Sequence, residues 1–173
     1  MRRRVLTPHA GLATAIGYYL SGMEEVRTQL VVAVKAIPDE LIGKPAFLGA
    51  HSIGALVLHI GEAEWFWVQM VVGGHELTDE DKKAPCWDIL DDVEAVARNG
   101  FTTEFCLMEI EKIRNQTRDL LFSYNAKDLE RIINYERNGV MTEHNLRWIL
   151  HHLIDHEAQH KGQILMLKRL MAL

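Results

Sequence analysis

Four long stretches of this chain place apolar residues at steps of three and four, which is the spacing of an amphipathic α-helix. The predicted long helices cover residues of about 8–36, 52–72, 103–124 and 143–171. Proline and glycine interrupt the pattern between them, and a short extra helix is expected at about 88–98. Helices of this kind bury their apolar stripes by packing side by side. The sequence therefore predicts an all-α four-helix bundle, formed as a single domain by residues 1–173.

Residues that commonly cap helices mark the predicted helix starts. The predicted N-terminal positions are Thr7 followed by Pro8, Ser52, Thr102 or Thr103, and Thr142. Before the last helix, Ile132, Ile133 and Tyr135 favour extended structure, and Asn138-Gly139 is a typical turn sequence. This segment is expected to be a loop or a marginal hairpin.

Charge and composition restrict the class of protein. The chain has 173 residues, a formal net charge of -5 and no basic face, which argues against a nucleic-acid partner. No run of about 18 apolar residues occurs, so no membrane span is expected. The N-terminal arginines precede an apolar-leaning stretch that polar residues interrupt, which favours an amphipathic helix over a signal peptide. Cys86 and Cys106 lack CxxC spacing and are expected to be free thiols of a cytoplasmic protein.

The last predicted helix contains the sequence HHLIDHEAQHKGQI, in which four histidines fall within ten positions. Because a helix turns by about 100° per residue, His152, His156 and His160 share one face. Two imidazoles four residues apart can bind one metal ion. The outer two of the three lie about 12 Å apart along the axis, which is too far for a shared ion. Spacing therefore leaves two pairs open: His152 with His156, or His156 with His160.

A catalytic metal usually takes three protein ligands and leaves one position for water. The third ligand is expected from the second helix, where His59 lies in the apolar sequence LVLHIGEAEW. His51, in the loop before that helix, is the competing candidate. The alternative is that these histidines are ordinary packed or exposed residues. Imidazole ligands favour zinc or nickel, because iron and manganese more often recruit a carboxylate.

Two stretches, HSIGALVLHIGEAEWFW and LHHLIDHEAQHKGQI, resemble the ligand segments of the DinB-like (damage-inducible B, YfiT-related) metal-binding proteins. The resemblance follows the order of the helices over essentially the whole chain. It implies an up-down-down-up course of the bundle, frequent dimers and a three-histidine site. By motif position it implies His59, His156 and His160 as metal ligands. His152 would be a neighbour one turn away that packs, orients a ligand or carries protons.

Several neighbours of the histidines are further candidates. HEAQH has the HExxH pattern, so Glu157 is either a base, as in metalloproteases, or a solvated or bridging carboxylate. The second interpretation is preferred because the resembling family is not a protease family. Asp155 either holds a histidine N–H or is an exposed charge, Gly162 is expected to allow close helix packing, and Gln163 to face a neighbouring helix. The remaining candidates, expected in the core or around the pocket, are Trp65, Trp67, Arg147 and Trp148.

A three-histidine site fits two classes of function. The first is a metal-dependent hydrolase or thiol S-transferase, in which the ion activates water or a low-molecular-weight thiol towards a small-molecule substrate. The thiol is implied by the resemblance. The second is a non-catalytic metal-binding, stress-response or interaction bundle without an accessible fourth ligand position. The first helix carries apolar residues on more than one side, which favours a homodimer.

Overall fold

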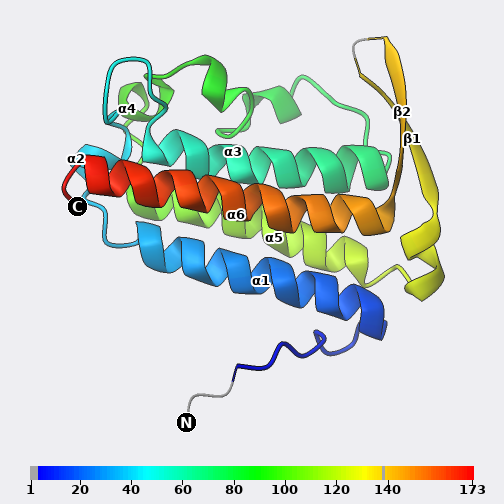
Figure 1. Ribbon diagram of the computed structural model, residues 1–173. Helices are drawn as coiled ribbons and strands as arrows, with labels where there is room; N and C mark the ends of the chain where they lie inside the picture. Colours follow the sequence, from blue (N-terminus) through cyan, green and yellow to red (C-terminus); the bar gives the residue numbers. More distant parts are fainter. Residues whose placement is uncertain (1–3, 138) are drawn as a thin grey trace.

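A computed structural model describes residues 4–137 and 139–173 of the chain. Its four long α-helices are α1 (Thr14–Val34), α3 (Ile53–Trp65), α5 (Thr103–Leu121) and α6 (Leu146–Leu170). Helices α1 and α6 run in one direction and α3 and α5 run in the other (Figure 1). This is the up-down-down-up course, so the prediction of an all-α four-helix bundle is confirmed.

Shorter elements connect the long helices. Because α3 and α5 are parallel neighbours, the chain must return along the bundle between them, and residues 73–102 make this connection. It contains the turns η2 (Asp81–Lys83) and η3 (Ile89–Asp91) and helix α4 (Ala95–Arg98). The other short elements are α2 (Asp39–Ile42), η1 (Phe66–Val72), η4 (Ala126–Glu130), β1 (Ile132–Arg137) and β2 (Val140–Asn145). No helix within the two described ranges is long and apolar enough to cross a membrane.

Side-chain caps fix the starts of two long helices as predicted. Ser52 caps α3 and Thr102 caps α5, because the side-chain oxygen of each accepts a hydrogen bond from the backbone N–H three residues further on. The predicted helix start at Thr7-Pro8 is wrong, since α1 begins at Thr14. Gly11 lies between these points with a φ of 84°, a left-handed conformation that a right-handed helix cannot include.

The segment before α6 is a regular antiparallel hairpin with six residues in each strand. Thr142 lies in β2 opposite Tyr135 and donates its hydroxyl proton to the carbonyl of that residue at 3.0 Å, so the predicted cap is wrong. Asn145 caps α6 instead, because its Oδ1 accepts the N–H of Trp148 at 2.8 Å. Asn138 of the predicted turn lies outside the described residues. The hairpin stands at the end of the bundle where α6 begins (Figure 1).

Two predicted helices differ in their internal geometry. The second long helix is α-helical to Trp65 and then continues as the π-helical segment η1. The short helix predicted at 88–98 is split into η3 and α4, because Asp92 between them has extended backbone angles of -129° and 97°. In both segments the chain follows the predicted course, but its backbone hydrogen bonds are not those of the single continuous α-helix that was predicted.

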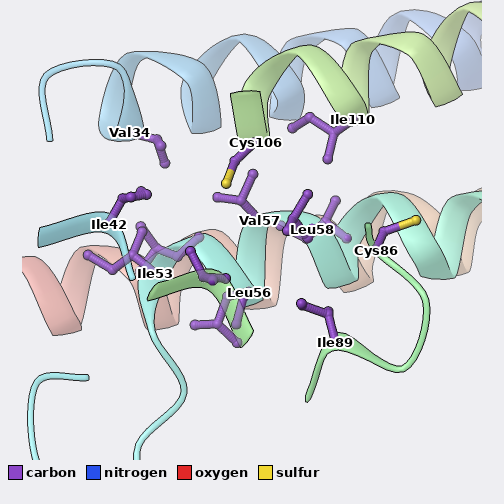
Figure 2. Packing of buried hydrophobic residues seen from close by; sticks show 14 of the residues in the cluster. Val34, Ile42, Ile53, Leu56, Val57, Leu58, Cys86, Ile89, Cys106 and Ile110 are labelled. Carbon is purple, nitrogen blue, oxygen red and sulfur yellow. The ribbon is translucent and has the colours of Figure 1, made fainter. Parts of the chain in front are cut away.

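The apolar core is divided into two clusters. One contains the C-terminal halves of α1 and α6, the N-terminal part of α5 and the buried apolar residues of α3 (Figure 2). The other contains the N-terminal halves of α1 and α6, the C-terminal end of α5 and the π-helical segment η1. On each long helix one buried charged residue lies between the two clusters: Arg27, Glu64, Arg114 and Glu157. We call these four residues the charged layer. Cys86 and Cys106 in the first cluster are free thiols, and burial raises the pKa of each to about 12.

Candidate metal centre

Three histidines from two helices meet beside the charged layer. One ring nitrogen each of His59 on α3 and of His156 and His160 on α6 lies within 4.8 Å of the other two. The Nε2 atoms of His156 and His160 are 3.1 Å apart. The centroid of the His59 ring lies 5.2 Å from the centroid of the His156 ring and 5.0 Å from that of the His160 ring. Nitrogens that share a tetrahedral ion at about 2.0–2.1 Å lie about 3.4 Å from one another. The three nitrogens therefore need only small movements to reach one common centre.

Hydrogen bonds orient two of these rings through their Nδ1 atoms. His59 Nδ1 donates to Glu62 Oε2 at 3.0 Å, and Glu62 Oε1 accepts the backbone N–H of Asp88 at 2.8 Å. His160 Nδ1 donates to Gln163 Oε1 at 2.8 Å, so the prediction that Gln163 faces a neighbouring helix is wrong. A ring that donates through Nδ1 leaves the Nε2 lone pair free, and metal-ligating histidines are commonly held in this way.

The surroundings of His156, His160 and their neighbour His152 favour the neutral form of these imidazoles. Burial, together with the neighbouring histidines, lowers the pKa of His156 to about 3. Burial also lowers the pKa values of His160 and His152 below their ordinary range. A metal ion binds the deprotonated ring nitrogen. At neutral pH these rings are therefore in the protonation state that ligation requires.

A cavity of about 530 Å³ opens beside the histidines, and we call it the histidine cavity. Its lining includes His59 and His156 of the cluster. Four aromatic side chains form much of its wall: Phe66, Trp67, Trp87 and Trp148. This volume is in the range of small-molecule sites, which span about 300–1,000 Å³. A second cavity of about 580 Å³ lies near α2 and α4 and contains none of the histidines.

The hairpin supports one wall of the histidine cavity through a stack of rings. The ring of His152 lies 4.9 Å from that of Trp148 with only 5° between their planes, and Trp148 stacks in turn on His144 of β2 at 4.4 Å. Trp67 packs edge to face against His144 and His152 at 5.1 Å and 5.5 Å. His152 is thus part of the wall. Of the two histidine pairs that the spacing left open, the one that meets His59 is His156 with His160.

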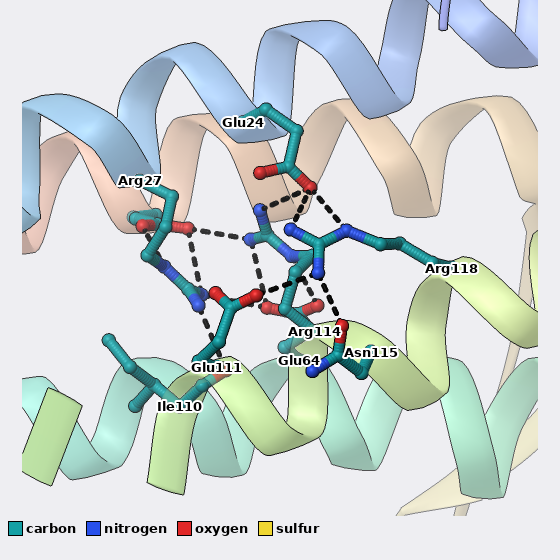
Figure 3. Close-up of polar contacts among 9 residues, drawn as sticks. Glu24, Arg27, Glu64, Ile110, Glu111, Arg114, Asn115 and Arg118 are labelled. Atoms are coloured by element: carbon teal, nitrogen blue, oxygen red, sulfur yellow. Dashed lines mark hydrogen bonds and ion pairs between the residues drawn. The ribbon is translucent and has the colours of Figure 1, made fainter. Parts of the chain in front are cut away.

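Glu157 belongs to the charged layer and does not line the cavity. Its Oε1 accepts from Arg27 Nε at 2.6 Å and its Oε2 from Arg114 Nη2 at 3.0 Å. Glu64 accepts from the same two arginines at 2.9 Å and 2.7 Å (Figure 3). Burial raises the pKa of Glu64, but the charges of Arg114 and Arg27 outweigh burial and hold it at about 2. Glu157 therefore bridges two buried arginines; it is neither a solvated carboxylate nor a free base.

The remaining candidates are not members of the three-histidine cluster. His51 is not among the three clustered nitrogens. Asp155 is exposed and accepts a hydrogen bond from a glutamine one turn on, and Arg147 pairs with a glutamate of η4. Apart from its chain neighbours and its own helix backbone, no heavy atom of the described residues lies within 4 Å of the position of a Cβ at Gly162, so the prediction of close helix packing there is wrong. Trp65 packs against the first apolar cluster, whereas Trp67 lines the histidine cavity.

Sequence reasoning missed two kinds of functional residue. Glu62 follows His59 by three positions on one helix, a spacing that brings side chains together and that the sequence displays. Asp88 comes from the 73–102 connection, where no periodicity predicts its approach to α3. The charged layer also left a signal, because Arg27 occupies a position at helical spacing between apolar residues of α1.

Comparison with known proteins agrees with this architecture. YfiT from Bacillus subtilis, described as a probable metal-dependent hydrolase with an unusual four-helix bundle topology, is similar with a TM-score of 0.65 and 16% sequence identity. The similarity covers 99% of this chain and 93% of that chain, and it shows a shared fold. No curated protein matches the sequence. A family model described as the DinB superfamily matches residues 23–164, a range that includes all three clustered histidines, and the chain therefore belongs to the DinB superfamily.

Proposed function

We propose that this protein is a metal-dependent enzyme of the hydrolase or thiol S-transferase type, with His59, His156 and His160 as ligands of one divalent ion. The observation that carries the proposal is the position of the three nitrogens, within 4.8 Å of one another at the wall of a cavity of about 530 Å³. The description of YfiT as a probable metal-dependent hydrolase supports the same class of function.

The donor set fits a borderline-soft divalent ion. Three neutral imidazoles without a carboxylate suit zinc or nickel better than iron or manganese. Three protein ligands are the number that catalytic zinc sites use when one position stays open for water or substrate. A divalent ion at this point supplies Lewis acidity, which lowers the pKa of a coordinated water or thiol and polarises a carbonyl group.

The chain's own residues orient and enclose this chemistry. Glu62 and Gln163 hold the rings of His59 and His160, so the ligand lone pairs keep their direction. The aromatic wall removes the substrate from bulk water, which strengthens electrostatic interactions inside the cavity. Two of the clustered histidines face a cavity with room for a substrate, and this favours an enzyme over a bundle that the ion only stabilises.

The nucleophile is water in a hydrolase and a low-molecular-weight thiol in an S-transferase. Within the described part of the chain, no lysine or arginine lines the histidine cavity. This favours water over a thiol that carries carboxylate groups, because buried anionic groups require basic partners.

The proposal is tested by turnover with and without an intact cluster. Zinc-loaded protein is incubated with a panel of aryl esters and amides, and separately with an electrophile and low-molecular-weight thiols. We expect turnover that chelation abolishes, that His59→Ala abolishes and that His51→Ala retains, since His51 lies outside the cluster. Equal rates for the unaltered and His59→Ala proteins would contradict the proposal. Zinc binding with a large rise in melting temperature but no turnover would favour the non-catalytic alternative.

A further inference from the structure

The charged residues that line the histidine cavity are all acidic. They are Glu62 and Asp88, and no lysine or arginine of residues 4–137 and 139–173 belongs to the lining. Glu62 is engaged by His59 and by a backbone N–H. Asp88 is exposed, and no hydrogen bond or ion pair to its carboxylate occurs within the described part of the chain. The cavity thus presents an uncompensated negative charge at its edge.

The backbone of Asp88 is held in an unusual conformation. Its φ and ψ are 49° and 28°, which is the left-handed region that few residues other than glycine adopt, although aspartate and asparagine tolerate it. In this conformation its N–H donates to Glu62 at 2.8 Å. Residues held in this way cluster at ligand sites, where the surrounding structure maintains the strain. The hydrogen bond from its backbone N–H therefore holds Asp88, whose carboxylate is free, next to Glu62, the residue that orients His59.

The walls that accompany this charge are flat and apolar. Three of the four tryptophans of the chain line the cavity, together with Phe66. Aromatic walls of this kind bury large flat groups of a ligand, and ring faces also attract cations. An anionic group placed away from the histidines would meet carboxylates, aromatic rings and Ala63, none of which carries a positive charge.

We infer that the cavity selects a small organic cation, namely a flat apolar molecule that carries an ammonium group which pairs with Asp88. The inference rests on the proposed function, because it assigns the substrate class of the same site. The reactive group of such a molecule faces the histidines, and its aromatic or otherwise flat body lies against the tryptophans.

The test compares three probes that share a ring and differ in charge: benzylammonium, benzyl alcohol and benzoate. Binding to metal-free protein is followed at pH 7 by the fluorescence of the cavity tryptophans, and metal is omitted because benzoate would ligate it. We expect benzylammonium to bind most tightly and benzoate most weakly. Comparable affinity for benzoate and benzylammonium, or no binding of any probe, would overturn the inference.

The variant Asp88→Asn removes the charge while keeping a residue that tolerates the left-handed backbone. An exposed carboxylate–ammonium pair contributes about 0.2–1 kcal/mol, so the affinity for benzylammonium should fall by about 1.4- to fivefold. The affinity for benzyl alcohol should stay unchanged. Asp91→Asn is the matched control, because Asp91 is exposed, lies three residues away and does not line the cavity. An equal effect of the two variants would overturn the role of Asp88.

A separate zinc titration of the same samples distinguishes the two proposals. If the protein fails to bind zinc but prefers cations in a way that depends on Asp88, the proposed function is contradicted and the cation selectivity of the cavity stands. Zinc binding without cation preference would leave the metal site and remove this substrate class.

Discussion

Replacing Glu157 by glutamine removes one of the two negative charges of the charged layer and keeps the shape of the side chain. Glu157 is 3% exposed and accepts hydrogen bonds at 2.6 Å and 3.2 Å from Arg27 and at 3.0 Å from Arg114. After the change the two arginines share only the carboxylate of Glu64. The charged layer then holds two arginines and one carboxylate, and Glu24, 3.7 Å from Arg114 Nη1 and partly exposed, offsets only part of this excess positive charge.

The expected cost follows from this burial. Removing one partner of a buried ion pair destabilises a protein by about 3–5 kcal/mol. The amide oxygen of Glu157→Gln retains part of the hydrogen bonding, so we expect the lower end, about 3 kcal/mol. For a chain of this size that loss lowers the melting temperature by about 6–12 °C, since 1 kcal/mol corresponds to about 2–4 °C. Urea and thermal unfolding followed by circular dichroism measure both quantities.

A matched variant shows whether the effect belongs to the charged layer. Asp155→Asn removes the same charge from the same helix at an exposed position, and it should change the unfolding free energy by less than about 0.5 kcal/mol. If Glu157→Gln leaves stability unchanged and abolishes turnover, then Glu157 acts as a base in the HExxH sense and the structural role argued above is wrong.

Three further predictions concern other parts of the molecule. Because the pKa of Glu64 is about 2 in the folded protein against an ordinary value of 4.5, stability should fall by on the order of 3 kcal/mol as the pH drops from 4.5 to 2, and acid titration of Glu64→Gln should show a shallower loss. Glu62→Gln should weaken zinc binding about 10- to 100-fold in calorimetry with little change in fold, since it loosens the ring of His59. Gly54→Ala should destabilise by about 1–3 kcal/mol, because its Cβ would lie 2.9 Å from another side chain. Gly162→Ala should stabilise by about 0.5–1 kcal/mol, because among the described residues its Cβ would meet no atom outside its own helix backbone and chain neighbours within 4 Å, and denaturant melts of the two variants should move in opposite directions.

Helical periodicity predicted the bundle because each long helix buries a stripe of apolar residues that is interrupted by only one charged residue. The errors occur where a single backbone conformation or a distant contact decides the structure. Helix α1 starts later in the sequence than predicted because Gly11 has a left-handed conformation. Thr142 pairs with Tyr135 in the hairpin and therefore does not cap the last helix as predicted. Neither effect changes the apolar pattern, so the pattern could not reveal them.

The sequence likewise predicted one part of the site and could not predict another. The i, i+4 spacing on α6 limited the ligand pair to two choices, and the resemblance to the DinB-like proteins selected His156 and His160. The structure brings these two residues to His59, although metal binding by them stays a prediction. The approach of Asp88 to Glu62 joins residues 26 positions apart through a backbone N–H, which no side-chain pattern records.

The proposed function requires that His59, His156 and His160 bind one divalent ion. Anomalous diffraction from crystals of zinc-loaded protein tests it most directly, because the signal locates the ion and identifies its ligands. We expect a single strong peak with all three Nε2 atoms at about 2.0–2.1 Å and a further ligand position open to the cavity. An ion bound elsewhere, or zinc-saturated crystals in which these three rings share no ion, would contradict it.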